Sequence, residues 1–292
     1  RSRGLGDVYK RQDFYGQSKF NDYPQLLTAS NAVIEMCEKV GLEFAIVYED
    51  RTIKSILDQG GGNKIGLAKN DLLYIEKNYF PKSHYINIKN KPILLNFGPI
   101  TLTSNEDWEN IFSEIITDFY FFPLAYHPQY YDLNTIADGV YSWVREAQSD
   151  DFYKYGKQFD YLGGSGIFEF REFYEEGGWD NTGQSDILPR EGNLLRETLQ
   201  KSITSSVDFI QLITWNDWGE GTAIEPSIEY QFEPLSIIQE FVGTSFKKED
   251  LDLSISLYLK RKEYKNNSLV NKKLDQVFYY LVSLQTSEAK EI

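Results

Sequence analysis

Cysteine and histidine are scarce in this sequence, and their scarcity excludes several kinds of site. Cys37 is the only cysteine, so an internal disulfide is impossible, and so is a metal or redox site built from a cysteine pair. The two histidines, His84 and His127, are too few for a zinc site of three histidines, and they make a Ser-His-Asp triad a poor candidate. We therefore expect no metal and no cofactor.

Long apolar runs are also missing. A transmembrane helix needs about 18 or more consecutive apolar residues, and the sequence contains no such run, so we expect no transmembrane segment. Lysine and arginine number 30 against 44 aspartates and glutamates, a formal net charge of −14, and this acidic balance argues against a nucleic-acid partner. Hydrophobic residues make up 41% of the chain and aromatic residues 15%, which is enough for a full core and excludes global disorder.

Residues 1–12 (RSRGLGDVYKRQ) are a basic stretch without an apolar pattern at the start of an acidic chain. We interpret them as a non-native or disordered leader and leave them out of the fold prediction. A native basic arm is the alternative. On our interpretation any export signal that preceded the chain is lost, so the sequence leaves the location of the protein open.

Short apolar runs alternate with helical patterns over most of the chain. The runs are apolar at consecutive positions and rich in β-branched and aromatic residues, which is typical of strands buried on both faces of a parallel sheet. Between them, apolar residues recur at spacings of three and four, which predicts helices. The predicted strands are 13–15 (a stub), 44–50, 92–98, 118–127, 139–144, 164–170 and 209–217, and the predicted helices are 25–40, 65–78, 106–117 and 191–206.

This alternation predicts an α/β fold of the TIM (β/α)8 barrel type. A doubly wound sheet is the alternative, but no glycine-rich phosphate-binding pattern follows any predicted strand. Two amphipathic helical patterns follow residue 247, and we expect them to pack on the outside of the barrel. The predicted organisation is a leader at 1–12, a barrel at 13–246 and a helical extension at 247–292.

Polar and aromatic residues follow several of the predicted strands. The active site of such barrels lies at the carboxyl ends of the strands, so these residues predict a polar, ring-lined cleft. Glu49 and Asp50 could instead cap a helix. His127 could be a structural group, and Trp143 could pack in the core or at the rim. Trp179, in the segment 170–183, is a further candidate. The candidates for sugar binding outside 214–227 are thus Glu49, Asp50, Tyr126, His127, Trp143 and Trp179.

The segment TWNDWGEGTAIEPS, at 214–227, carries the strongest candidate chemistry. It contains Asp217 and Glu220, whose spacing of three puts both carboxylates on the same side of a helical turn or tight loop. Two carboxylates in one cleft are what glycosidic cleavage needs, one protonated and the other ionised. The alternative is a helix N-terminus that Asn216 and Asp217 cap, with Glu220 in its first turn.

Other residues of this segment suit a sugar site. Trp215 and Trp218 could offer flat apolar faces to a sugar ring and a wall of low dielectric constant beside the acid. Asn216, between the tryptophans, is a further candidate for sugar binding. Glu225 could orient the loop or a sugar hydroxyl. A cluster of glutamates just upstream, Glu172, Glu175 and Glu176, has the pattern of a solvated helical face.

The segment 214–227 resembles the hallmark of the glycoside hydrolases of families 71 and 99, which include the endo-α-mannosidases and the fungal α-1,3-glucanases. The similarity extends over most of the chain, in the order found in the bacterial 71/99-like proteins. The further matching segments are FAIVYEDRT (44–52), KPILLNFGP (91–99), FFPLAYH (121–127), FREFYEEGGWDNTG (170–183) and LLRETLQKSITSSVDFIQLITWND (194–217).

The resemblance implies a TIM barrel that hydrolyses O-glycosyl bonds of a poly- or oligosaccharide, with Glu220 as general acid and Asp217 as base or assisting carboxylate. Family 99 has glutamate where this chain has Asp217, so the stereochemical course is not carried over. In the resembling proteins a segment like 13–16 (DFYG) ends the second strand. The first strand and most of the second are therefore expected to be missing, and the activity of such a fragment stays open.

We expect a monomer. By the same analogy we expect it to be secreted, periplasmic or attached to the cell surface. Two alternatives differ in function. One is a carbohydrate-binding or polysaccharide-assembly protein that uses the same barrel without hydrolysis. The other is a barrel in which the motif only caps a helix.

Overall fold

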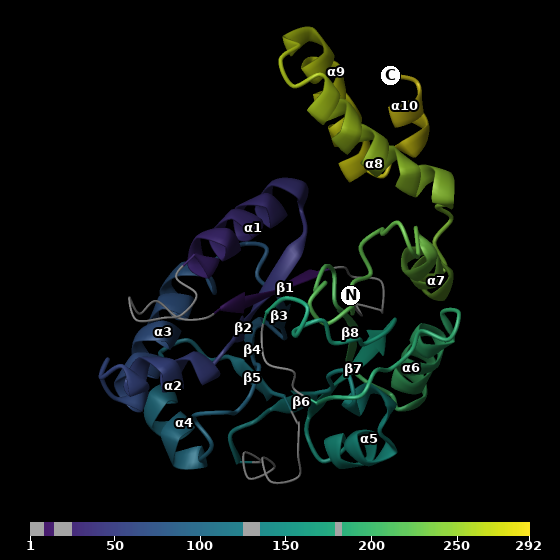
Figure 1. Ribbon diagram of the computed structural model, residues 1–292. Coiled ribbons are helices and arrows are strands. Elements are labelled where there is room, and N and C mark those ends of the chain that lie inside the picture. The colour runs from purple at the N-terminus through teal and green to yellow at the C-terminus, as the bar shows by residue number, and fades with distance from the viewer. Residues whose placement is uncertain (1–8, 15–24, 125–134, 179–182) are drawn as a thin grey trace.

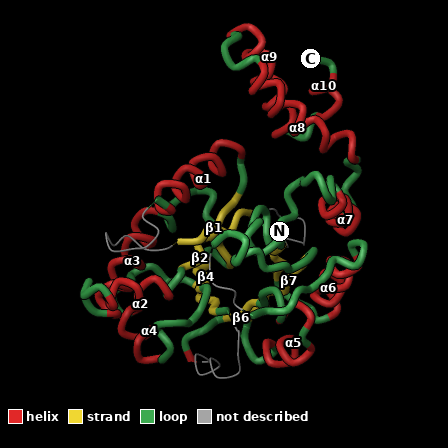
Figure 2. Tube along the Cα trace, viewed as in Figure 1, coloured by secondary structure: helices red, strands yellow, loops and turns green. Residues whose placement is uncertain are grey.

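Strands lie at the centre of the computed structural model and helices surround them (Figures 1 and 2). The structure describes residues 25–124, 135–178 and 183–292, and the backbone of residues 9–14. The first sheet contains β1 (Tyr9–Phe14), β2 (Glu43–Tyr48), β3 (Asn87–Ile88), β4 (Lys91–Asn96) and β5 (Tyr120–Pro123). Its parallel strands run in the order β1-β2-β4-β5, and β3 pairs antiparallel with β4.

A second parallel sheet contains β6 (Gly139–Tyr141), β7 (Tyr161–Ile167) and β8 (Phe209–Ile213), paired in that order. A bridge between Leu124, directly after β5, and Tyr141 of β6 joins the two sheets. The predicted α/β architecture is thus confirmed. Among the described residues β8 does not pair with β1, and the two sheets do not close into a complete barrel there.

Helices connect β1 to β2, β2 to β4, β4 to β5, β6 to β7 and β7 to β8, as the alternation in the sequence predicted. Those next to the first sheet are α1 (Leu26–Val40), α2 (Arg51–Asp58), α3 (Lys64–Asn78) and α4 (Asn105–Phe112). Those next to the second sheet are the 3-10 helix η2 (Glu146–Gln148), α5 (Asp150–Gly156), α6 (Asn193–Thr204) and α7 (Glu233–Val242).

Strand β2 is buried on both faces, which explains its run of consecutive apolar residues. Phe44 and Ile46 belong to the core cluster that includes residues of α1, α3 and α4. Ala45 and Val47 alternate with them and belong to a second cluster, with Leu95 of β4 and residues of β5 and β6. Because alternate residues of a strand point to opposite faces, the sheet separates these two cores.

The first strand differs from the prediction. A stub was expected at 13–16, after a leader at 1–12, but β1 begins at Tyr9 and pairs in parallel register from Tyr9 opposite Glu43 to Phe14 opposite Tyr48. The ladder is made by backbone groups, so the open edge of β2 can accept an extended segment whose side chains show no strand pattern. Tyr15 and Gly16 lie outside the described residues.

The C-terminal helices also differ from the expectation that they pack on the barrel. They are α8 (Lys248–Glu263), α9 (Ser268–Val282) and α10 (Thr286–Lys290). They pack on one another, and Figure 1 shows them standing apart from the helices around the sheets, beyond α7. The Nζ of Lys248 donates to Oε1 of Gln231, 3.0 Å away, beside this connection. No helix in the described part of the chain is long and apolar enough to cross a membrane.

Candidate active site

The loop after β8 is closed at its base by Thr214. Its backbone N–H donates to the carbonyl of Thr222 at 2.9 Å, and the two threonine hydroxyls lie 2.9 Å apart. The hydroxyl of Thr214 also accepts the backbone N–H of Asp217 at 2.9 Å. Residues 214–222 form bends and turns and no helix, so the predicted alternative of a helix N-terminus is not what the structure shows.

Asp217 and Glu220 are joined by a turn within this loop. The backbone N–H of Glu220 donates to Oδ1 of Asp217 at 3.0 Å. Asp217 is exposed, whereas Glu220 is partly buried. The spacing of three therefore brings the two candidate catalytic residues together through a side chain that caps a tight turn.

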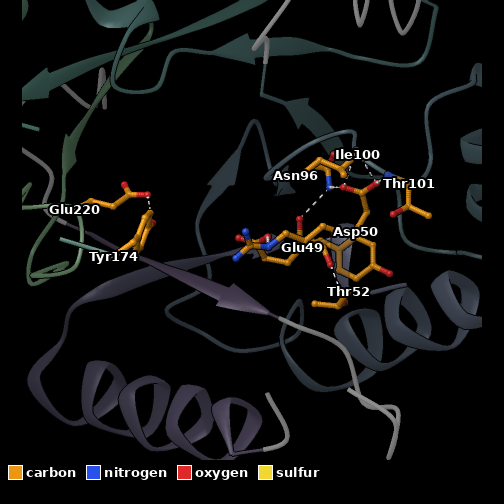
Figure 3. A network of polar contacts seen from close by, with 10 residues as sticks. Glu49, Asp50, Thr52, Asn96, Ile100, Thr101, Tyr174 and Glu220 are labelled. Atoms are coloured by element: carbon orange, nitrogen blue, oxygen red, sulfur yellow. Dashed lines mark hydrogen bonds and ion pairs between the residues drawn. The ribbon is translucent and has the colours of Figure 1, made fainter. Parts of the chain in front are cut away.

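A tyrosine from the preceding loop holds the carboxyl group of Glu220. The hydroxyl of Tyr174 donates to Oε1 of Glu220 at 2.6 Å, and Figure 3 shows the two side chains pointing toward each other. Two backbone hydrogen bonds of 2.9 Å fix this contact, from the N–H of Arg171 to the carbonyl of Glu220 and from the N–H of Phe173 to the carbonyl of Gly219. The loops after β7 and β8 are thus paired beside the candidate acid.

The environment of Glu220 raises the pKa of its carboxyl group. The largest cause is burial, which penalises the charged form, and the charges of Asp217 and Glu172 add to it. The hydrogen bond from Tyr174 and the positive charge of Arg51 oppose the rise. A raised pKa keeps more of the carboxyl protonated near neutral pH, as a general acid requires.

Glu49 lies at the end of β2 and is almost fully buried, with 3% exposed. Its Oε2 lies 3.2 Å from Nε of Arg51, which is half exposed at the start of α2. The pKa values of Glu220 and Tyr174 are both raised, and the positive charge of Arg51 opposes both rises. This charge therefore acts on the loop that carries the candidate acid. Glu49 is therefore paired with Arg51, a cation whose charge acts on Glu220.

Asp50 binds the backbone of another loop. Its carboxylate is fully buried and accepts the backbone N–H groups of Ile100, Thr101 and Leu102 at 2.7 to 3.1 Å. The Nδ2 of Asn96 lies 3.4 Å from its Oδ1, and Figure 3 shows this network. Asp50 precedes α2 but makes no side-chain cap there. These contacts hold the loop between β4 and α4 and occupy the buried carboxylate of Asp50.

The predicted aromatic face of the loop is accessible. Trp215 is 44% exposed and Trp218 is 51% exposed, and Asn216 between them is exposed as well. Glu225 is partly buried, and its backbone N–H donates to the carbonyl of Trp215 at 2.9 Å. Trp215, Asn216 and Trp218 therefore lie on the same closed loop as Asp217 and Glu220, and Glu225 lies just after it.

Trp143 packs against protein. Its ring lies at 5.0 Å and 83° to that of Phe97, an edge-to-face contact between the segments that follow β6 and β4. This agrees with the packing alternative. The predicted residues Tyr126, His127 and Trp179 lie outside the described residues.

Tyr174 and Arg51 were not among the predicted site residues. Both lie within segments used for the resemblance, yet a tyrosine in a glutamate-rich turn and an arginine that opens a helix have no signal of their own. Their importance depends on which loops meet in space. In the described part of the chain no group of three or more histidine, cysteine, aspartate or glutamate residues is placed to hold a metal ion.

No family model matches the chain, and no curated protein matches it by sequence. Solved structures do match its fold. The glycoside hydrolase family 99 endo-α-mannosidase from Bacteroides thetaiotaomicron, in complex with bis-tris propane, has a TM-score of 0.57 at 17% identity over 79% of this chain and 78% of that chain. The chain has the fold of a glycoside hydrolase.

Two further structures agree. Another structure of the Bacteroides thetaiotaomicron endo-α-mannosidase has a TM-score of 0.58 at 15% identity, covering 80% of this chain and 75% of that chain. A glycoside hydrolase-like protein has a TM-score of 0.58 at 13% identity, covering 81% of each chain. The resemblance to families 71 and 99 that the motif indicated is supported by these three folds.

Proposed function

We propose that this protein is a glycoside hydrolase that cleaves an O-glycosidic bond of a poly- or oligosaccharide by acid/base catalysis. One observation carries the proposal: a partly buried carboxyl group with a raised pKa, Glu220, is joined by one turn to an exposed carboxylate, Asp217, at the carboxyl end of β8. This is the edge of the sheet at which barrel enzymes of this fold carry their chemistry.

The roles of the two acids follow from their surroundings. Glu220 is the residue whose pKa is raised by burial, so it is the general acid that protonates the leaving oxygen. Asp217 is exposed, and its Oδ2 accepts no hydrogen bond from the described residues, which leaves it available as base or assisting carboxylate. We assign neither a retaining nor an inverting course.

The exposed tryptophans support a sugar substrate. Trp215 and Trp218 present aromatic surface on the loop that carries both acids. Large exposed aromatic side chains beside a polar cluster are typical of a ligand site. Because two of the structures with this fold are endo-α-mannosidases, α-mannosides are the first substrates to test.

The test is a glycan screen on the purified chain, with released reducing ends as the measure of hydrolysis. We expect wild-type turnover on at least one α-linked glycan. Glu220→Gln should lower kcat by about 100-fold or more, because a general acid contributes that much, and should leave glycan binding by calorimetry intact. Glu175→Gln, an exposed glutamate of the neighbouring turn, is the matched control and should keep wild-type turnover.

Two results would contradict the proposal. If Glu220→Gln turned over glycan at the wild-type rate, Glu220 would not be the acid. If the wild-type chain bound glycans without hydrolysing any, the function would be that of a carbohydrate-binding or polysaccharide-assembly protein on the same fold.

A further inference from the structure

The carboxyl group of Glu220 is held on one side only. Oε1 accepts the hydroxyl of Tyr174 at 2.6 Å, whereas Oε2 accepts no hydrogen bond from the described residues. The two oxygens of a carboxylic acid differ when it is protonated, because one is a carbonyl acceptor and the other carries the proton. A donor fixed on Oε1 therefore assigns the proton to Oε2.

The backbone makes this contact specific. The N–H groups of Arg171 and Phe173 donate to the carbonyls of Glu220 and Gly219, each at 2.9 Å, so the strand-like segment before Tyr174 is paired with the segment that ends at Glu220. Tyr174 also lies against the backbone of that segment, since a Cβ added at Gly219 would be 3.7 Å from its Cε1 atom. The phenol is thus delivered to the carboxyl group by two paired loops.

We propose that Tyr174 is a positioning residue for Glu220: its hydroxyl fixes Oε1 and leaves Oε2 to carry and donate the catalytic proton. This role rests on the proposed function. When the proton leaves Oε2 for the glycosidic oxygen, the bond from that oxygen to the sugar carbon breaks and its electron pair stays on the leaving oxygen. Glu220 becomes a carboxylate, and the hydrogen bond from Tyr174 strengthens as the charge develops.

The charges around Glu220 are consistent with this role. Asp217 faces it from its own loop, Tyr174 and Glu172 face it from the loop after β7, and Arg51 faces it from the start of α2. The pKa of Tyr174 is itself raised, first by burial and then by the hydrogen bond to Glu220, so the phenol stays protonated and remains a donor. Among these groups Tyr174 is the one with a hydrogen bond to the carboxyl oxygens of Glu220.

The chain supplies a matched pair for comparison. The hydroxyl of Tyr230 donates to Oε2 of Glu169 at 2.9 Å, and burial raises the pKa of Glu169. The charged groups that act on Glu169 are Glu229, Arg171 and Asp186, and neither Asp217 nor Glu220 is among them. Tyr230→Phe therefore removes the same hydroxyl from a tyrosine–glutamate pair outside the candidate site.

The experiment compares Tyr174→Phe and Tyr230→Phe with wild type by two independent measurements. The first is the pKa of Glu220 from carboxyl-carbon NMR, with the signal assigned through Glu220→Gln. The second is the pH profile of kcat and KM on the glycan hydrolysed fastest by wild type. Phenylalanine keeps the ring, and thermal unfolding verifies that both variants are folded.

We expect Tyr174→Phe to raise the pKa of Glu220 by about one, because a hydrogen bond to a charged group is lost. An acid must be protonated to act, so the alkaline limb of the kcat profile should move to higher pH by the same amount. The value of kcat at its optimum should fall about ten-fold or more, and KM should change little. Tyr230→Phe should alter none of these.

Each other result overturns the inference, and the two measurements show whether the proposed function fails with it. If wild type hydrolyses glycan and Tyr174→Phe leaves the pKa of Glu220 unchanged, Tyr174 is not a positioning residue, while the proposed function stands. A rise in KM with unchanged kcat would make Tyr174 a substrate contact instead. If the pKa moves as expected but wild type hydrolyses nothing, the hydrogen bond exists without a catalytic role, and the proposed function falls.

Discussion

The side chain of Asp217 accepts a 3.0 Å hydrogen bond from the backbone N–H of Glu220, so one candidate catalytic residue positions the other. The hydroxyl of Thr214 binds the backbone N–H of Asp217 at 2.9 Å, which ties the same turn to the end of β8. Asp217 therefore has two separable roles. Its oxygen shapes the loop, and its negative charge acts on Glu220 and on the reaction.

Asparagine at 217 separates these roles, because its carbonyl oxygen can still accept the N–H of Glu220 while the charge is lost. We expect Asp217→Asn to keep the wild-type thermal midpoint and to lower kcat by about 100-fold or more, the usual contribution of a general base. The pKa of Glu220 should fall, because the charge of Asp217 raises it. Kinetics and carboxyl-carbon NMR measure the two effects.

Asp217→Ala is the comparison, since alanine removes the acceptor as well as the charge. It should lower the thermal midpoint in addition to the activity. Full turnover by Asp217→Asn would exclude a charged role for this side chain, and the loop-shaping role would be the one that remains.

Arg51 should set part of the pH dependence. Its positive charge lowers the pKa of Glu220, so Arg51→Gln should raise that pKa and move the alkaline limb of the kcat profile to higher pH. The arginine side chain is 48% exposed, and solvent screens its charge, so we expect a shift of less than about one pH unit that shrinks as salt is added. Initial rates at low and high ionic strength test both statements.

Lys54→Gln is the matched control, because Lys54 lies on the same helix and pairs at 2.8 Å with Asp58 on an exposed surface. It removes one positive charge without touching Glu49 or Glu220. An equal shift in both variants would mean that net charge, and not the position of Arg51, governs the profile.

The elements of the barrel were predictable because their signals are local. Strands such as β2 and β4 carry apolar residues on both faces, and the helices between them carry apolar residues at spacings of three and four. Residues 9–12 of β1 were not predicted as a strand. They pair with the backbone at the open edge of β2, and their own sequence has no strand pattern. The position of 247–292 was not predictable either, since an amphipathic pattern does not say which surface covers it.

The site, too, was predictable only where its residues are close in sequence. Asp217 and Glu220 are close in sequence, so their spacing could be interpreted directly. Tyr174 lies in a turn whose glutamates resembled a solvated helical face, and it reaches Glu220 only because the loops after β7 and β8 pair. Asp50 likewise acts through residues about 50 positions away, which no local pattern records.

Asp50 should be important for stability and not for sugar contact. Alanine at this position would remove the buried acceptor of the backbone N–H groups of Ile100, Thr101 and Leu102. We expect Asp50→Ala to lower the free energy of unfolding by about 3–5 kcal/mol, as for a broken buried charge network. Urea titration followed by circular dichroism measures it.

The control is Asp58→Ala at the end of α2, the helix that follows Asp50. Asp58 is 64% exposed and pairs with Lys54, so its loss should cost less than about 1 kcal/mol. If Asp50→Ala were no more destabilising than Asp58→Ala, the three backbone hydrogen bonds would not be what holds the loop before α4.

The two glycines that flank Glu220 should respond differently to a methyl group. Gly221 has a φ of +62°, and a Cβ there would lie 3.0 Å from the carbonyl oxygen of Arg171. Gly219 has no positive φ, and its nearest contact would be an ordinary 3.4 Å to Oδ1 of Asp217. Gly221→Ala should thus lower the free energy of unfolding by about 1–2 kcal/mol, because side chains avoid the left-handed region, whereas Gly219→Ala should change it little.

The same pair of variants tests whether the paired loops position the acid. The methyl group at 221 pushes against the segment that leads to Tyr174, so Gly221→Ala should weaken the contact of that tyrosine with Glu220 and lower kcat more than it raises KM. Gly219→Ala leaves this segment in place and should retain most of the turnover. Kinetics at a temperature well below both unfolding midpoints separates this effect from instability. Equal kcat in the two variants would show that the spacing between the loops after β7 and β8 does not control the acid.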